Sequence, residues 1–296
     1  MLGLGPVLCL TLLLSCAKKT SVPSGDADGA RLRVMTFNIL AGGVQRGEGL
    51  SRSAEVIRAA EADVVVLQEH GFSAYPLAMN LGWEVKVFGF DNAILSRYPI
   101  VETLDKGARV RVADGVDVIV HGVHLAPYPY GPYDHRDDSA LAADDLIETA
   151  ERARGQAIEL YLDDLAPFFD EGLPVFLAGD FNEPSHLDWT DRAVDQGLRA
   201  IPVQWPTSFA VTAAGMKDSY RVIHPDPVSR PGNTWTPAPG KNEVHDRIDL
   251  IYFAGPGVKA IDSRIVGPDD SVSDLIVEPY PSDHRAVVSE FVVQTH

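Results

Sequence analysis

The sequence predicts an α/β domain in which helices cover β-sheets. Apolar runs of strand length alternate along the chain with stretches of helical periodicity. Two of these runs, Asp63–Leu67 and Leu173–Leu177, are typical of strands that are buried on both faces. The chain has 296 residues, of which 45% are hydrophobic and 23% are charged, and it shows no internal repeat. Together these observations indicate a globular protein of mixed helix and strand content.

The amino-terminal segment is predicted to be an export signal and is excluded from the fold. Leu2–Leu14 is apolar, short for a membrane span and typical of a secretory signal. The residues up to Cys16 resemble the lipobox of bacterial lipoproteins, in which the cysteine becomes the lipidated first residue. We therefore expect a signal peptide at 1–15, lipidated Cys16 with a flexible tether at 16–30, and the folded domain at 31–296. The expected location is the cell envelope, as an exported lipoprotein held at a membrane through Cys16; plain secretion is the alternative.

Strand and helix patterns follow one another from Arg31 onward. Apolar and β-branched runs predict strands at Arg33–Leu40, Asp63–Leu67, Trp83–Phe88, Asn92–Ser96, Val116–Leu125, Leu173–Leu177, Asp249–Phe253 and Ala286–Val293. Helical spacing of apolar residues predicts helices at Ser51–Glu61 and Ser139–Leu165. Ser185 and Asp188 suggest a cap for a further helix that runs through Leu198. The segment Ala126–Asp138 is dense in Pro, Gly and Tyr and is predicted to be a loop.

The stretch Leu177–Pro184 places two polar side chains where a buried strand stops. Gly179 allows a close approach or a bend, and Pro184 cannot continue a ladder of hydrogen bonds. Asp180 and Asn182 are two positions apart, so in extended chain they face the same side and can face one ligand. An isolated Asp-x-Asn is usually a turn, so this interpretation depends on the other strands.

Several other predicted strands also end or begin with a polar residue that can bind a metal or a phosphate. These residues are Asn38, Glu69, His124, Asp249 and His284. Carboxylates, amides and imidazoles without cysteine make an oxygen-rich site, which favours Mg²⁺ or Mn²⁺ as the cofactor.

Such a set of residues can hydrolyse a phosphoester bond. A divalent cation on Glu69 would polarise a phosphoryl oxygen, and Asn38, Asn182 and His124 would donate hydrogen bonds to the phosphoryl oxygens. Asp180 would orient or deprotonate a water molecule. His284, held in one tautomer by Asp249, would act either as a base or as a cation that faces the phosphate.

Eight segments stand out in sequence order: Asn38, Leu67–Glu69, Ala93–Ile100, His124–Leu125, Gly179–Asn182, Asp218–Arg221, Arg247–Asp249 and Ser282–His284. Together and in this order they resemble the endonuclease/exonuclease/phosphatase superfamily. The resemblance implies a four-layer α/β/β/α sandwich of two packed mixed β-sheets flanked by helices. It also implies metal-dependent cleavage of phosphoester bonds in the cleft between the sheets.

Position by position, the resemblance implies a role for each matching residue. Glu69 becomes the principal metal ligand, with Asn38 and Asp283 close to the metal. Asp180 positions the nucleophile, Asn182 and His124 contact the phosphate, Asp249 is the partner of His284, and Asp218 supports the site from nearby. The superfamily includes nucleases, neutral sphingomyelinases and inositol phosphate phosphatases, so membership leaves the substrate open.

The charge balance bears on the choice of substrate. The formal net charge is −17, and no basic run lies near the catalytic segments, so a long polynucleotide is disfavoured. We expect a monomer that acts on a small-molecule or lipid-headgroup phosphodiester or phosphomonoester. A secreted Mg²⁺-dependent nuclease is the first alternative, and a non-catalytic binding module on the same scaffold is the second.

Residues next to the matching segments have other interpretations. His70 is expected to be a surface imidazole, and His121, three residues before His124, to lie either in the core or behind the residues that line the site. Asp246 is either a solvated loop carboxylate or a third acidic ligand. Trp235 and the tyrosines at 128, 130 and 133 either border the site or pack on the domain.

Overall fold

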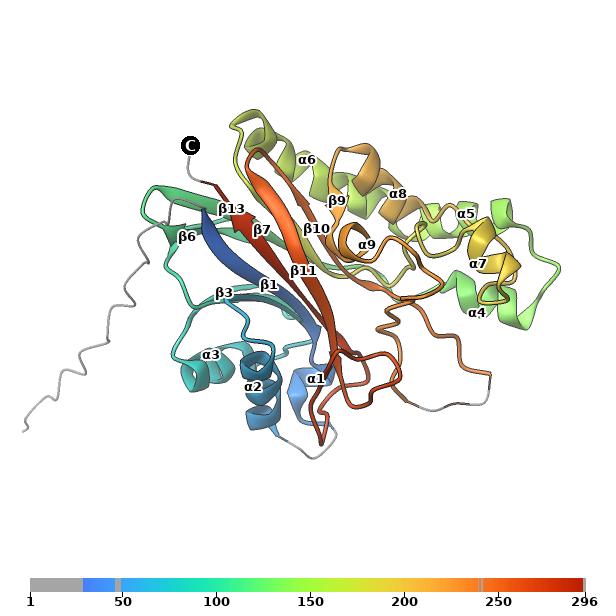
Figure 1. Ribbon diagram of the computed structural model, residues 1–296, viewed down its shortest axis with the longest axis horizontal. Helices are drawn as coiled ribbons and strands as arrows, with labels where there is room; N and C mark the ends of the chain where they lie inside the picture. The colour runs from blue at the N-terminus through green and yellow to red at the C-terminus, as the bar shows by residue number, and fades with distance from the viewer. Residues whose placement is uncertain (1–28, 46–48, 239, 241, 295–296) are drawn as a thin grey trace, which may run out of the picture.

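Two mixed β-sheets pack face to face in the computed structural model, and helices cover their outer faces (Figure 1). The structure describes residues 29–45, 49–238, 240 and 242–294. The predicted signal peptide, Cys16 and most of the predicted tether lie outside the described residues, so those assignments stay predictions. Within the described ranges, no helix has the length and apolar character needed to span a bilayer.

Among the described residues, the sheets have seven and six strands. The first has the order β12-β11-β13-β1-β2-β4-β3, with bounds Leu275–Ile276, Val258–Gly267, Ala286–Val293, Ala30–Asn38, Val64–Gln68, Asn92–Ser96 and Glu84–Phe88. The second has the order β5-β6-β7-β8-β10-β9, with bounds Ile100–Thr103, Gly107–Ala113, Val116–His124, Val175–Asp180, Asp249–Ala254 and Lys217–Asp218. The pairs β1–β2, β7–β8 and β11–β12 are parallel and the other pairs are antiparallel, so both sheets are mixed.

Three apolar clusters separate four layers. One fills the space between the sheets, the second lies between the first sheet and helices α2 and α3, and the third lies between the second sheet and helices α6 and α8. The helices are α1 Leu40–Gly43, α2 Leu50–Ala59, α3 Ala74–Leu81, α4 Gly131–Asp137, α5 Ala143–Ala150, α6 Gln156–Asp170, α7 Asp191–Asp195, α8 Pro206–Ala213 and α9 Ser219–Ile223. Figure 1 shows α2 and α3 on one side of the strands and α6 and α8 on the other. The predicted α/β/β/α sandwich is therefore confirmed.

The alternation of side chains along the strands gathers polar residues at one edge. In β8, Phe176 and Ala178 belong to the cluster between the sheets, so Asp180 points to the same space. The parallel partner of Asp180 is His124, the last residue of β7, and its antiparallel partner is Asp249, the first residue of β10. In β1, Leu32 and Val34 belong to the same cluster, so Asn38 at the end of this strand also points between the sheets. It lies opposite Asp180, to which it donates a hydrogen bond.

Two local predictions were wrong, and a third, the long helix, is confirmed with different bounds. The predicted loop Ala126–Asp138 contains α4, which has a proline in its first turn, where proline is tolerated. The predicted helix Ser139–Leu165 begins at Ala143, extends to Asp170 and contains a five-residue π-helical segment, Glu151–Gly155. Thr190 caps α7 by accepting from the Ala193 N–H, whereas Asp188 pairs with buried arginines.

The outer face of β7 carries His121, a buried imidazole. Both ring nitrogens lack a hydrogen-bond partner among the described residues, and the ring packs against Phe168 and Gly107. Burial lowers the pKa of His121 to about 4; nearby Asp164 opposes the shift and Lys106 adds to it. Of the two predicted positions for His121, the structure shows the core, and the ring is neutral at physiological pH.

His121 is expected to make the protein less stable in mild acid. The unfolded chain takes up a proton on this ring below about pH 6.5, whereas the folded chain takes it up only near pH 4. The contribution of the neutral ring to the free energy of unfolding is therefore fully present above about pH 6.5 and is lost as the pH falls to about 4. The loss amounts to about 3 kcal/mol at the acid end. Urea unfolding at about pH 7 and about pH 5 should therefore show a smaller acid loss for His121→Leu than for wild type. If the free energy of unfolding fell equally in both proteins between the two pH values, groups other than His121 would be responsible.

Candidate active site

A cavity of about 640 Å³ opens where the polar strand ends converge. Its wall includes four carboxylates and two imidazoles: Glu69, Asp91, Asp180, Asp283, His124 and His284. No Lys or Arg is among the described residues that line it. A phosphate in this cavity would therefore meet a negative wall unless a cation accompanied it.

Asn38 joins the two sheets through hydrogen bonds to two residues that line the cavity. Its Nδ2 donates to Glu69 Oε1 at 3.1 Å and to Asp180 Oδ2 at 3.1 Å. Its Oδ1 accepts from the Leu40 N–H at 3.0 Å, which fixes the orientation of the amide. One fully buried side chain thus sets the distance between the carboxylates of Glu69 and Asp180.

Glu69 follows β2 in an unusual backbone conformation. Its φ is +54°, and its Oε2 accepts from the Ala41 N–H at 2.9 Å. Ala41 and Asn182, at φ +45° and +47°, also line the cavity. Non-glycine residues in this region are strained, and such strain is concentrated at functional sites.

His284 in the cavity wall forms a buried pair with Asp249, which lies behind it. His284 Nδ1 lies 3.0 Å from Asp249 Oδ2, and His284 Nε2 lies 3.8 Å from Asp180 Oδ2. Burial alone would lower the pKa of His284, but the carboxylates of Asp249, Asp180 and Asp283 together raise it to about 10. At neutral pH the ring therefore carries a proton on both nitrogens and can donate from Nε2.

His124 and Asn182 complete the wall around Asp180. His124 Nε2 lies 3.9 Å from Asp180 Oδ2, on the same oxygen that faces His284 and Asn38. The other oxygen of Asp180 accepts from the Asn182 N–H at 2.8 Å, and Asn182 Nδ2 donates to the Leu125 carbonyl at 2.9 Å. One oxygen of Asp180 is therefore positioned by the backbone, and the other lies among three polar side chains.

The acidic residues fit a divalent cation. Asp283 Oδ1 is buried and has no hydrogen-bond partner among the described residues, and Glu69 lines the same cavity. Asp180, Asp249 and His284 also have ligand atoms within 4.8 Å of one another. We favour Glu69 and Asp283 as the place for the cation, because the Nδ1 of His284 is already bonded to Asp249 and hard cations prefer oxygen ligands.

Asp218, His70 and Asp246 lie away from the cavity wall. Asp218 caps the amino-terminal end of α9. It also forms an ion pair at 2.8 Å with the buried Arg247, which precedes Asp249 by two residues. His70 is buried, with Nε2 3.0 Å from the Asn92 carbonyl oxygen, so its predicted exposure was wrong. Asp246 is neither solvated nor a ligand in the cavity, because the Tyr130 hydroxyl, the Trp189 N–H and Arg199 all bind it.

Aromatic side chains hold one side of the cavity. The Trp235 ring packs on the His284 ring with centroids 4.9 Å apart, and its N–H donates to the Tyr133 hydroxyl at 2.9 Å. Tyr133 in turn donates to Glu243 at 2.7 Å. Tyr128 is exposed at the mouth and Tyr130 is buried, so the tyrosine segment both borders the cavity and packs on the domain.

Arg154 is a residue that the sequence patterns did not single out. It lies in the π-helical segment and is fully buried. Its guanidinium donates to the carbonyls of Ala126 and Pro129 at 2.8 and 2.7 Å and lies 3.7 Å from Glu183 Oε2. Arg154 therefore links the segment after His124 to the residue after Asn182. The helical pattern alone gave no signal for this, because Arg in an amphipathic helix is normally exposed.

Arg154→Lys is expected to destabilise the protein by about 1–3 kcal/mol, because an ammonium cannot reproduce the two directed bonds to carbonyls. The change in the free energy of unfolding in urea measures this. Arg152→Lys is the matched control in the same segment, since Arg152 is exposed and pairs with Glu148 on the surface. Equal small effects in both variants would show that Arg154 does not hold the two segments.

Comparison with known proteins explains this geometry. The model of the endonuclease/exonuclease/phosphatase family matches residues 35–284, which include every cavity residue described above. The chain belongs to this family. As a member of the endonuclease/exonuclease/phosphatase family, it is an enzyme that cleaves phosphoester bonds, and its acidic cavity matches the dependence of such enzymes on a divalent metal.

Similar proteins span nearly the whole chain. An uncharacterized protein of Caenorhabditis elegans is 29% identical over 313 residues, which cover 95% of this chain and 96% of that protein. An endonuclease/exonuclease/phosphatase from Beutenbergia cavernae has a similar structure, with a TM-score of 0.58 and 21% identity over 90% of this chain and 72% of that chain. A 3′-5′ exonuclease from Neisseria meningitidis matches with a TM-score of 0.54 and 23% identity over 88% of this chain and all of that chain. These two structures support the fold of this family member.

Proposed function

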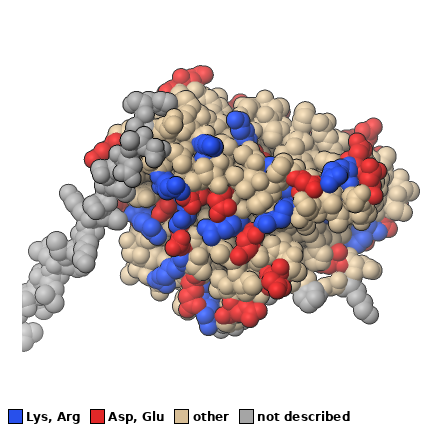
Figure 2. Space-filling view, in the orientation of Figure 1, with Lys and Arg blue, Asp and Glu red and all other residues tan. Residues whose placement is uncertain are grey.

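We propose that this enzyme hydrolyses the phosphoester bond of a small molecule or of a lipid headgroup, with Mg²⁺ or Mn²⁺ as its cofactor. The observation that carries the proposal is the lining of the cavity, in which four carboxylates are described and no Lys or Arg. A long polynucleotide binds chiefly through cations that neutralise many phosphates. Lys and Arg are interspersed with Asp and Glu on the face shown in Figure 2, without a broad basic patch.

Glu69 and Asp283 would hold the cation, and Asn38 would keep Glu69 in place through its hydrogen bond. Bound there, a divalent cation supplies positive charge that offsets the charge of the phosphoryl oxygens and of the leaving oxygen. This role suits a cavity that has no Lys or Arg among its described lining residues and whose carboxylates outnumber its imidazoles.

Asp180 is the proposed acceptor of the proton from the attacking water. It is buried at the centre of the polar group, and one of its oxygens faces both imidazoles. His284, oriented by Asp249, would donate from Nε2 to a phosphoryl oxygen, and His124 and Asn182 would donate to the others. Asp218 would act indirectly, through Arg247, on the start of β10.

A nuclease is the second candidate, because exposed aromatic side chains at the cavity mouth can stack on bases. The similar Neisseria meningitidis protein is an exonuclease. We also propose that the chain is exported and lipidated at Cys16, which the sequence motif supports, and that it acts as a monomer.

A substrate panel separates these candidates. The full chain with Mg²⁺ would be assayed on bis-p-nitrophenyl phosphate, inositol phosphates, sphingomyelin vesicles, RNA and plasmid DNA. The proposal predicts a higher kcat/KM on a small or lipid substrate than on either nucleic acid. Activity confined to the nucleic acids, falling steeply with added salt, would make the enzyme a nuclease.

Glu69→Gln is expected to raise the Mg²⁺ concentration that gives half-maximal activity by roughly 10- to 100-fold, because a neutral amide replaces a charged oxygen ligand. A Mg²⁺ titration of the initial rate measures this shift. Asp91→Asn, in the same cavity wall but outside the Asn38 network, is the matched control. An unchanged Mg²⁺ requirement in Glu69→Gln would remove Glu69 from the cation site.

A further inference from the structure

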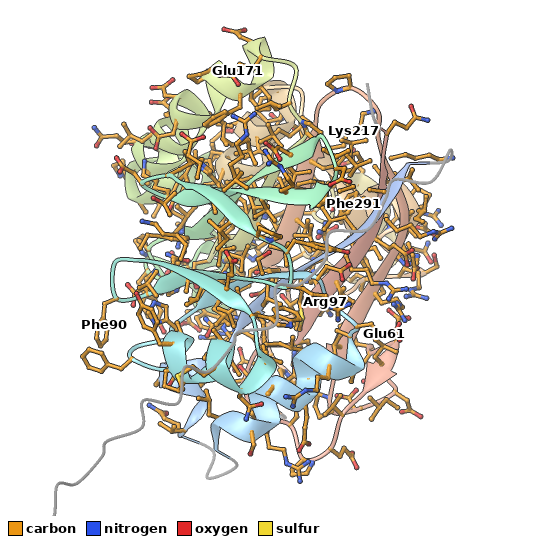
Figure 3. All side chains as sticks on the ribbon, turned by 90° about the vertical axis from the view of Figure 1, so that its left-hand side faces the viewer. Glu61, Phe90, Arg97, Glu171, Lys217 and Phe291 are labelled. Carbon is orange, nitrogen blue, oxygen red and sulfur yellow. The ribbon has the colours of Figure 1, made fainter. Side chains whose placement is uncertain are left out.

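Large apolar side chains are exposed beside the cavity mouth, within one segment of the chain. Phe72 is 85% exposed, Met79 83%, Tyr75 59% and Phe90 58%. We call these four residues the apolar rim. Phe72 and Phe90 line the cavity and meet edge to face with ring centroids 4.9 Å apart. Figure 3 shows Phe90 projecting away from the body of the protein.

The apolar rim is built on a short, regular scaffold. Tyr75 and Met79 lie four residues apart in α3, so they emerge on the same side of that helix. The buried residues of α3, Ala74, Leu77 and Ala78, pack in the cluster beneath the first sheet. The opposite side of α3 therefore presents its apolar side chains to the exterior, which in a soluble protein marks an interaction surface.

Charge indicates which kind of surface the rim fits. No charged residue occurs between His70 and Glu84, although the whole chain carries a formal net charge of −17. An anionic surface would be repelled by the net charge, and a basic partner would find no carboxylate between His70 and Glu84; the nearest exposed one in the sequence beyond Phe90 is Asp91. A zwitterionic lipid bilayer has no net charge and accepts aromatic and thioether side chains at its interface.

We propose that the apolar rim docks on a zwitterionic lipid bilayer and thereby presents the cavity to lipid headgroups. This inference rests on the proposed function and specifies its substrate as a phosphoester within a bilayer. Phe72 belongs to the rim and also lines the cavity. Docking of the rim would therefore place the cavity mouth against the lipid headgroups.

The predicted lipid anchor is compatible with this docking. The nine residues of β1 span about 30 Å from Ala30 to the cavity edge. The 13 residues that follow Cys16, up to Gly29, reach at most roughly 45 Å when extended. A lipid on Cys16 and the rim can therefore contact the same membrane.

Docking can be tested without any activity. The chain has two cysteines, Cys9 and Cys16, so replacing both with serine leaves the full chain free of thiols and of the predicted lipid. Met79→Cys in that background would carry one polarity-sensitive fluorophore, and Leu160→Cys on exposed α6 would be the matched control. With phosphatidylcholine vesicles, we expect a blue shift of the emission at position 79 and none at position 160.

A second test uses hydrolysis. The double variant Tyr75→Ser/Met79→Ser changes only rim residues outside the cavity wall. It should lose about tenfold in rate on phosphatidylcholine vesicles, because interfacial binding scales with the apolar area that is buried. Its rate on monomeric bis-p-nitrophenyl phosphate should stay within about twofold of wild type.

The outcomes are distinguishable. A fluorophore at position 79 that is insensitive to vesicles overturns the docking, and so does a blue shift that appears only when a second copy of the chain or another protein is added. Equal losses on vesicles and on the monomeric substrate also overturn it. If the fluorophore responds but neither substrate is cleaved, the docking stands and the proposed function fails.

Discussion

Asp180→Asn is expected to lower kcat by about three orders of magnitude, because the variant keeps the shape of the side chain but cannot accept a proton. Asp180 is buried and lies 3.1 Å from Asn38 Nδ2, 3.8 Å from His284 and 3.9 Å from His124. Its loss thus removes the acceptor that all three groups surround. Single-turnover rates with saturating Mg²⁺ would measure the chemical step directly.

The control for this variant is Asp91→Asn, which makes the same isosteric change in an exposed carboxylate of the same cavity. It should lose far less activity, and both variants should keep the wild-type circular dichroism spectrum. If the two variants lost similar amounts of activity, the negative charge of the cavity as a whole would explain the loss, and Asp180 would have no specific role as proton acceptor.

Combining Asp249→Asn with His284→Ala should cost little more activity than the worse single change. Each single variant is expected to lose about 10²- to 10³-fold in kcat/KM, since Asp249 orients the ring that faces the phosphate. Once one member of such a unit is gone, the other has nothing left to act through. Losses that multiply in the double variant would show that the two residues act separately.

The free energy of unfolding provides an independent test of the interaction between Asp249 and His284. His284→Ala leaves the carboxylate of Asp249 buried without its partner, which is expected to destabilise the fold by about 3–5 kcal/mol. The double variant replaces that carboxylate with a neutral amide and should be more stable than His284→Ala alone. Urea unfolding of the four proteins would complete the cycle.

The edge of the sandwich where the cavity lies could be predicted from the sequence because the strands have clear periods. The sequence predicts that Asn38, His124, Asp180 and Asp249 lie at strand ends, and in the structure the alternation and register of these strands turn them inward and bring them together. The ordered resemblance supplied the four-layer arrangement, which the structure confirms. The roles of these residues stay predictions.

Other features could not be read from local patterns. Strands β5, β6 and β11 mix charged and apolar residues, so they lack the apolar runs that marked the central strands. Arg154 and Asp246 resemble surface charges in the sequence, and only distant partners make their burial favourable. The exposure of the apolar rim likewise depends on how α3 packs.

The most direct test of the central claim is the metal dependence of hydrolysis by the full chain. The enzyme would be treated with a chelator and assayed on bis-p-nitrophenyl phosphate while Mg²⁺ or Mn²⁺ is added back. The acidic cavity predicts no turnover in the chelator and a saturable recovery with the added cation, absent from Asp180→Asn. Turnover that continued unchanged in the chelator, or that recovered equally in Asp180→Asn, would contradict the account.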